Sequence, residues 1–306
     1  MARSQFGAFG SPDAARVGVS PDELTTRIRR REVHRVRRGA YVLASIHDSA
    51  DVDERYRMRI RAVLCSRPED RASHQSALVM LGIHTYGVDF GVVEVESRSV
   101  GRRRKSNRLV TNPWTYGDTW RNERYAMVAP ARACVQVAAT SGFMAAVCAM
   151  DSALHLGRCT REEIRHAALT LPPIHRTIAL RALEASDPRA ESVGETRTRI
   201  VLRDAGFTVE SQVELQVPGA GSRRVDFVVD GCVIVEFDGL VKYQNADGKH
   251  NLADEKARET RLSQMGYEVV RVIWSDLESP QSIIREIRQR RALAKERRRA
   301  MRATIR

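Results

Sequence analysis

The chain has 306 residues and a formal net charge of +13 at pH 7, with 51 Lys and Arg against 38 Asp and Glu. This length allows two or three domains with hydrophobic cores, and a pI of about 10.1 favours polyanionic partners such as nucleic acid or an acidic membrane face. Only five of the basic residues are Lys, so a general bias toward Arg is the alternative source of this charge.

The cysteines and the apolar segments exclude two further classes. The five cysteines are odd in number, scattered, and without metal-ligand spacing, which is typical of small core residues in a reduced, cytoplasmic protein. No signal peptide is evident, and no apolar run approaches the length of a membrane span. We therefore expect a soluble protein without a membrane partner, and an α/β (α+β overall) fold.

Residues 1–50 are predicted to form a winged-helix DNA-binding domain. The segment SPD at 11–13 is a helix start with Pro at the first position, and SPDE at 20–23 starts a second helix. Residues 33–38 and 41–43 then alternate like two short strands around a basic turn. Helix, turn, helix and hairpin is the order of a winged helix.

Arginines crowd the end of the second predicted helix and the basic turn. Phosphate contacts need this density of Arg side chains. The alternative is a solvated basic face on a small protein-docking domain. The predicted nucleic-acid contacts are Arg27, Arg30, Arg31, Arg35, Arg37 and Arg38.

Residues 51–188 are predicted to be a mixed α/β middle domain. Helices are expected at 52–64 and 73–81, strands in VDFGVVEVES and RYAMVA, and a basic loop in GRRRKSNRLV. The Ala-rich segment 130–157 predicts two packed helices, and Thr160 with Glu163 forms a capping box for another. The histidines here are isolated, which favours surface or satisfied core positions over metal ligation.

Residues 189–280 form the most informative predicted domain, and a basic helix at 281–306 follows it. A helix capped by Ser192, with Glu195 completing a capping box, precedes a strand and the hairpin RVDFVVDGCVIVEFDGLVKY at 224–243. A helix at 252–266 and a strand at 267–274 close the domain. The basic helix is amphipathic, and it is predicted to be either a solvated tail or a DNA contact.

The hairpin places three carboxylates, Asp226, Glu236 and Asp238, within its apolar strands. An unpaired carboxylate is costly to bury, and a divalent cation offsets that cost because carboxylate oxygens are its natural ligands. Mg²⁺ held by two carboxylates is a common device for cutting phosphodiesters. The alternative is a structural network in which Arg224, Arg258 and Arg271 pair with the acids.

The length of the hairpin loop decides whether the acids share a face. A three-residue loop at 229–231 places Asp226 opposite Ile234, so that Glu236 lies diagonal to Asp226 on the same face. A two-residue loop at 230–231 turns Glu236 to the opposite face unless a bulge intervenes. A metal site therefore predicts the three-residue loop.

The motifs from about residue 190 to 280 resemble the restriction-endonuclease-like PD-(D/E)xK nucleases. They are most similar to the domain of unknown function related to very-short-patch-repair endonucleases, through SVGE, VDF, VIVEFDG and DEKARETRLSQMGYEVVRVIWSDL. The resemblance implies a mixed central sheet and a Mg²⁺ (or Mn²⁺) site. Asp226 and Glu236 would be the metal ligands, assisted by Glu195 and Asp238.

Two departures from this family pattern bear on activity. The Lys expected two residues after the Glu is replaced by Asp238, and relatives with Asp-Gly there often carry a His at the place of Lys242. We expect Lys242 to steady charge that develops on the phosphate; Lys249, Lys256 and His250 lie nearby in the sequence. The departures leave open a domain that binds DNA without cutting it.

A second, softer resemblance concerns the first half of the chain. VHRVRRGAYVLA is similar to the winged-helix start of AbiEi-type antitoxins, and SHQSALVMLGI and YAMVAPARACVQVA are similar to their middle segment. It implies DNA binding and, as protein partners, a toxin encoded nearby or a second copy of this chain. The two functions expected are a metal-dependent DNA endonuclease of repair or defence, and a DNA-binding regulator or antitoxin with a degenerate nuclease domain. A docking protein without DNA affinity is the third.

Overall fold

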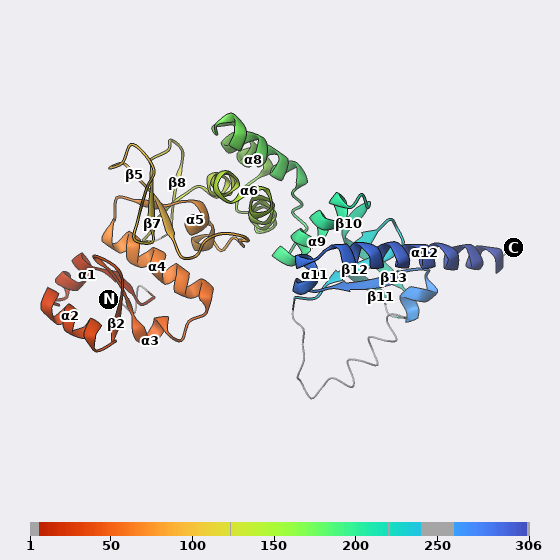
Figure 1. The fold of residues 1–306 in the computed structure, drawn as a ribbon, viewed down its shortest axis with the longest axis horizontal. Coiled ribbons are helices and arrows are strands. Elements are labelled where there is room, and N and C mark those ends of the chain that lie inside the picture. Colours follow the sequence, from red (N-terminus) through yellow and green to blue (C-terminus); the bar gives the residue numbers. More distant parts are fainter. Residues whose placement is uncertain (1–5, 123, 220, 240–259, 305–306) are drawn as a thin grey trace. The chain divides into compact units, whose positions relative to one another are not determined.

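The computed structural model describes residues 6–122, 124–219, 221–239 and 260–304, and it divides into two compact units (Figure 1). The first unit is Met1–Ser186 and the second is Asp187–Arg306. Both units combine helices with mixed or antiparallel sheets, so the predicted α/β fold is confirmed.

The chain begins with a three-stranded antiparallel sheet of order β1-β3-β2. The predicted order of two helices followed by a hairpin is present, and Ser20 caps the second helix through a hydrogen bond from Glu23 N. The elements are β1 (Ala8–Gly10), α1 (Ser11–Arg16), α2 (Pro21–Arg29), β2 (Val33–Arg37), β3 (Ala40–Leu43), α3 (Ala44–His47) and α4 (Val52–Ser66).

Helix α4 belongs to the core of this first sheet and also to the region that follows. Met58 and Ala62 pack with Ala8, Ala40 and Val42 in one buried cluster. On the same helix, Tyr56 donates to the Val92 carbonyl, hydrogen-bonds Ser76 and stacks on Phe90. The first 50 residues therefore share their core with the predicted middle region, and both lie in one unit.

A six-stranded sheet of order β6-β7-β5-β4-β9-β8 follows. The predicted basic loop at 101–110 is wrong, because β6 and β7 form a hairpin there with Ser106 paired to Leu109. Its two turn residues, Asn107 and Arg108, both have positive φ. The elements are β4 (Arg71–Ala72), α5 (His74–Met80), β5 (Val93–Ser97), β6 (Arg104–Ser106), β7 (Leu109–Pro113), β8 (Thr119–Arg121) and β9 (Ala126–Val128).

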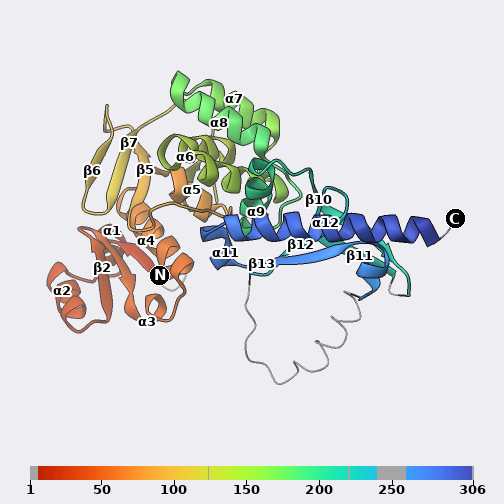
Figure 2. The ribbon, with the colours of Figure 1, turned by 45° about the vertical axis from the view of Figure 1, so that its right-hand side comes forward.

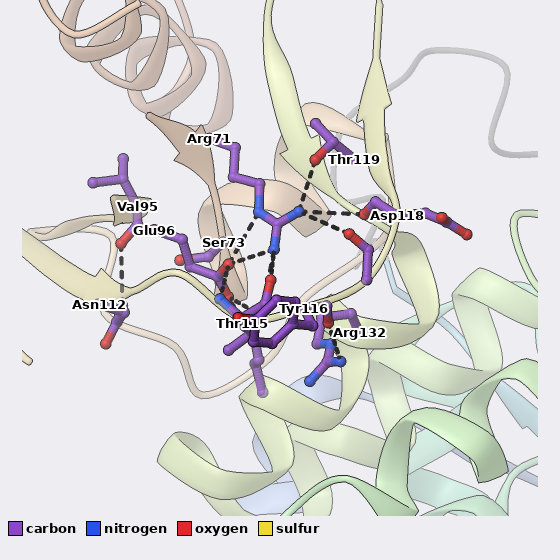
Figure 3. Close-up of polar contacts among 12 residues, drawn as sticks. Arg71, Ser73, Val95, Glu96, Asn112, Thr115, Tyr116, Asp118, Thr119 and Arg132 are labelled. Atoms are coloured by element: carbon purple, nitrogen blue, oxygen red, sulfur yellow. Dashed lines mark hydrogen bonds and ion pairs between the residues drawn. The ribbon is translucent and has the colours of Figure 1, made fainter. Parts of the chain in front are cut away.

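A buried ion pair lies within this sheet (Figure 3). Arg71, only 1% exposed, donates to fully buried Glu96 at 2.6 and 3.0 Å. Thr115 and Gln136 also donate to the Glu96 carboxylate, and the Arg71 guanidinium lies 4.1 Å from the ring centroid of Trp114. Such a satisfied network compensates for burying the two charges, which accounts for polar residues in otherwise apolar strands.

Three helices complete the first unit: α6 (Pro130–His155), α7 (Arg161–Leu169) and α8 (Pro173–Ala185). Gly142, with φ 84°, interrupts α6, so the predicted pair of helices is confirmed. The expectation that no apolar run has the length of a membrane span is wrong, because α6 is long and apolar enough to cross a membrane. It is mostly buried within the unit, as expected for a core helix of a soluble protein.

The second unit is a four-stranded mixed sheet of order β10-β11-β12-β13 with helices against it. The first three strands are antiparallel neighbours, and β13 runs parallel to β12. Of the helix predicted at 252–266, only the end lies within the described residues, where 260–264 are helical. The elements are α9 (Val193–Asp204), β10 (Val209–Val217), β11 (Gly221–Val229), β12 (Val233–Phe237), β13 (Glu268–Val272), α11 (Trp274–Glu278) and α12 (Gln281–Thr304).

Helix α12 is an integral part of this unit rather than a solvated tail. Figure 2 shows α12 lying along β12 and β13. Ile283, Ile287 and Ala294 on its inner face are buried in the same cluster as Val270 and Leu277. The basic amphipathic helix predicted at 281–306 is confirmed over 281–304, and its alternative as a solvated tail is wrong.

Candidate metal centre

The hairpin between β11 and β12 aligns the acids. Val229 pairs with Val233 and Phe227 pairs with Val235. Continuing this register places Asp226 directly opposite Glu236. Residues that face each other across antiparallel strands project to the same side of the sheet, so the predicted sharing of a face is retained.

The loop that sets this register has the three residues that a metal site predicts, but its position differs from the prediction. Cys232 N donates to the Val229 carbonyl at 3.0 Å, and Asp230 and Gly231 have φ of 46° and 66°. These are features of a type I′ turn centred on Asp-Gly. Cys232 is then an extra residue before the ladder resumes at Val233. The loop is three residues long but lies at 230–232, one residue later than predicted, so the predicted pairing of Asp226 with Ile234 is wrong and Asp226 lies opposite Glu236, two residues farther along β12.

Asp226 is a half-buried carboxylate whose Oδ2 accepts a hydrogen bond from Phe237 N at 2.8 Å. Burial raises its pKa to about 6, against the opposing effect of this hydrogen bond. The negative charges of Glu195 and Glu236 raise the pKa further, whereas Arg224 lowers it. Asp226, Glu195 and Glu236 therefore interact electrostatically, although α9, β11 and β12 each supply one of them.

Glu195 reaches the sheet because the start of α9 approaches β12 very closely. A Cβ atom at Gly194 would lie 1.9 Å from Cε1 of Phe237, so only glycine fits there. Ser192 caps the helix as predicted, with Oγ accepting from Glu195 N at 3.1 Å. The Glu195 carboxylate does not complete the predicted capping box. It accepts from Ser192 Oγ at 2.7 Å and from Glu191 N at 3.1 Å.

Gln212 is a member of this cluster that the sequence did not indicate. The pairs on either side of it in β10 place Gln212 across from Asp226. Its Nε2 donates to Glu195 Oε2 at 2.9 Å, while its Oε1 is buried with no hydrogen-bond partner among the described residues. Gln212 also has a φ of 52°. Within the alternating pattern of VESQVELQV nothing distinguishes this glutamine from a surface residue.

The remaining predicted site residues lie at or beyond the end of β12. Asp238 follows the strand, is exposed, and its backbone N donates to the Val272 carbonyl at 2.8 Å. Lys242, Lys249, His250 and Lys256 lie outside the described residues. Of the arginines in the structural alternative, Arg224 forms an ion pair with Glu191 at 2.9 Å, and Arg271 is the neighbour of Glu236 in the register of β12 and β13. Arg258 lies outside the described residues.

The donor chemistry of the cluster fits a hard divalent cation. Three carboxylates and an amide oxygen without a partner are the ligand types that Mg²⁺ and Mn²⁺ take. Within the described part of the chain, the possible ligand atoms of the three acids do not all lie within 4.8 Å of one another. Those of His34, His47 and Asp48, in the first unit, do meet this limit. Mg²⁺ keeps several waters and needs only one or two carboxylates, so the wider spacing remains compatible with it.

The predicted nucleic-acid arginines divide into three groups in the first unit. Arg27 is held by Glu23 at 2.7 Å, and the side-chain hydrogen bond from this pair raises its pKa. Arg37 is half-buried, and burial followed by the charge of Arg67 lowers its pKa. The exposed arginines suited to phosphate contact are Arg30, Arg31, Arg35 and Arg38.

Comparisons with known proteins add relatives without a described activity. No family model matches the chain. It is 30% identical over 152 residues to two Mycobacterium tuberculosis proteins, uncharacterized protein MT2308 of strain CDC 1551 / Oshkosh and uncharacterized protein Rv2248 of strain ATCC 25618 / H37Rv. The matched segment covers 49% of this chain and 55% of each relative. The chain thus spans about half the length of the curated relatives it matches.

Proposed function

We propose that the protein is a metal-dependent DNA endonuclease of DNA repair or defence against mobile DNA. The observation that carries the proposal is the convergence of Asp226 and Glu236, on the two inner strands of a mixed sheet, with Glu195 of α9, and the pKa of Asp226 raised to about 6. Mutually repelling, partly buried carboxylates are costly. A cation among them would offset that cost, which is the usual reason for such a cluster at a functional site.

Each residue of the cluster has a distinct role in this proposal. Asp226 and Glu236 are the metal ligands; Glu195 assists them, and Gln212 fixes the orientation of the Glu195 carboxylate through its 2.9 Å hydrogen bond. When bound, Mg²⁺ or Mn²⁺ would polarise a phosphodiester oxygen and the attacking water. The Phe237 N–H holds Asp226 Oδ2, so the other carboxylate oxygen is the one left to face the ligand. Asp238 is a further assisting acid, and Lys242 would steady negative charge on the phosphate.

DNA would be held by the first unit. We propose that Arg30, Arg31, Arg35 and Arg38, which are exposed around the end of α2 and the β2–β3 turn, contact backbone phosphates. Arg27 and Arg37 contribute less, because the first is paired with Glu23 and the second is half-buried. The proposed compartment is the cytoplasm, in keeping with five cysteines of which none forms a disulfide.

A DNA-binding regulator or antitoxin with a catalytically degenerate second unit is the alternative. It is favoured by Asp238, which stands where the PD-(D/E)xK pattern usually has Lys, and by the spacing of the acids, which do not all meet within 4.8 Å in the described residues. This alternative predicts DNA binding that needs no metal, and a toxin as protein partner.

The two functions are separated by a cleavage assay. Supercoiled plasmid, linear duplex and branched DNA are incubated with the full chain in Mg²⁺, Mn²⁺ or EDTA. We expect metal-dependent cutting that Asp226→Asn and Glu236→Gln abolish. The matched controls Asp204→Asn and Glu210→Gln, which change exposed acids of the same unit, should retain it. Equal DNA binding without cutting by the wild type and all four variants would favour the regulator.

A further inference from the structure

A basic cavity lies within the first unit, far in sequence from the acid cluster. Its volume is about 170 Å³, several times the roughly 10–15 Å³ that one water needs by the same measure. Strands β2 and β3, helices α3 and α4, strand β5 and the β6–β7 turn all contribute to its walls. The cavity thus joins the N-terminal sheet to the six-stranded sheet.

The polar lining of this cavity is positively charged. Arg35, Arg37, Arg59 and Arg108 all line it, and none of its lining residues is acidic. The nearest opposing charges lie outside the lining: Asp89 acts on Arg59, and Asp48 is hydrogen-bonded to the rim histidines His34 and His47 at 2.7 and 3.0 Å. Four arginines facing two outlying acids leave the cavity suited to an anion.

Two of these arginines have hydrogen-bond donors that the protein leaves unmatched. Arg37 Nη1 and Arg59 Nε are buried without a hydrogen-bond partner among the described residues. Burial lowers the pKa of both groups. The positive charge of Arg67 lowers the pKa of Arg37 further, and that of Arg108 lowers the pKa of Arg59. A buried donor atom without an acceptor is costly. An oxyanion in the cavity would bring acceptors and the opposite charge to both.

The turn that carries Arg108 provides an independent sign of function. Asn107 and Arg108 have φ of 44° and 61° in a two-residue hairpin loop. Such a turn favours Asn-Gly, because a side chain is strained at positive φ in the second position. Strained non-glycine residues cluster at functional sites, and this favours a role for the Arg108 side chain. That side chain lines the cavity.

We propose that this cavity binds a single phosphoryl group, held by Arg37, Arg59 and Arg108. The guanidinium group matches the geometry of phosphate oxygens through paired N–H donors. The phosphoryl group comes either from a free phosphate or nucleotide, or, under the proposed function, from a phosphate of DNA held by the first unit. The site needs no divalent cation and does not depend on the acid cluster.

The test uses Arg108→Gly, which removes the cation while relieving the backbone strain of the turn. Binding of inorganic phosphate and AMP to the full chain is measured by calorimetry and thermal shift in EDTA, at constant ionic strength with chloride as reference. A 5′-phosphorylated and a 5′-hydroxyl oligonucleotide are compared in the same way. The controls are Arg121→Gln, which removes an exposed arginine outside the cavity lining, and Asp226→Asn.

The wild-type protein should bind at least one of these phosphates more tightly than chloride. Arg108→Gly should melt at the same or a higher temperature without ligand, yet bind at least about 10-fold more weakly, and both controls should bind as the wild type does. Preference for inorganic phosphate or AMP identifies a free ligand, and preference for the 5′-phosphorylated strand identifies DNA. Unchanged binding in Arg108→Gly, an equal loss in Arg121→Gln, or no preference over chloride with any probe would overturn the proposal.

Discussion

Gly194 lies against the ring of Phe237 so closely that a Cβ atom would come within 1.9 Å of Cε1 and 2.2 Å of Cζ. The ring in turn packs edge-on against Trp274, with centroids 5.0 Å apart. This contact fixes the first turn of α9 to the end of β12. It thereby sets the position of Glu195 relative to Asp226 and Glu236, so one glycine supports both the packing and the acid cluster.

Gly194→Ala should therefore destabilise the second unit, although alanine is the better helix former. Overpacking of this kind costs about 1–3 kcal/mol, measured by urea unfolding. Phe237→Leu removes two of the three ring atoms that the new methyl group would meet. The double variant should recover most of the loss. Additive losses in the double-mutant cycle would mean that the two residues do not compete for this space.

Asp226→Asn should make the protein more stable at pH 7. The folded-state pKa of Asp226 is raised to about 6, chiefly by burial, so the folded protein holds this proton more tightly than the unfolded chain. The stability that Asp226 contributes is present at low pH and is lost as the pH rises from about 4 to about 6. The difference between variant and wild type should grow across that window, in unfolding measured without metal.

Asp230→Asn is the control of opposite sign. Burial alone would raise the pKa of Asp230, but hydrogen bonds from Arg291, at 2.6 Å, and from Thr208 N hold it below its ordinary value. The stabilisation from Asp230 is present above the unfolded pKa and is lost as the pH falls. This variant should be the less stable one at pH 7 and equal to the wild type in acid. The same sign for both variants would contradict the assigned environments.

Ile287→Ala tests whether α12 is part of the core. Ile287 is fully buried, and removing such a side chain costs about 2–5 kcal/mol. Leu293, on the same helix, is 49% exposed, and Leu293→Ala should change the free energy of unfolding by only about 0.5 kcal/mol. Equal, small effects of the two substitutions would mean that α12 is a solvated tail after all.

Glu96→Gln should be among the most damaging substitutions in the first unit. It leaves the buried guanidinium of Arg71 without its counter-charge, which costs about 3–5 kcal/mol. Glu162→Gln breaks the exposed pair with Arg165 at 3.0 Å and should cost at most about 1 kcal/mol. Thermal unfolding of the two variants would show whether the buried network stabilises the sheet. An effect of Glu96→Gln as small as that of Glu162→Gln would argue against such a role.

Local signals in the sequence predicted most of the fold. Ser20 and Ser192 cap helices at the expected places, and the alternating strands from 209 to 237 follow their apolar periodicity. The face shared by Asp226 and Glu236 was predicted, but not the register that aligns them. The sequence gives no sign that Cys232 is an extra residue after a type I′ turn, because cysteine is equally compatible with a paired strand position.

Long-range packing accounts for what the sequence did not reveal. Gln212 joins the cluster only because β10 pairs with β11 and Gln212 takes up a positive φ. The hairpin at 104–113 was mistaken for a loop because β6 is short and basic and the turn lacks glycine. Helix α12 resembles a basic tail because few apolar residues suffice to bury one face of a long helix.

The most direct measurement is a Mn²⁺ titration of the full chain, followed by the electron paramagnetic resonance signal of the free ion. We expect one Mn²⁺ site at pH 7 that weakens below about pH 6, where Asp226 takes up a proton. Asp226→Asn and Glu236→Gln should weaken it by at least about 10-fold, whereas His34→Gln, which alters the His34–His47–Asp48 group, should leave it unchanged. Absent binding, or equal binding by the wild type and the two acid variants, would contradict the proposal that these acids hold a catalytic metal.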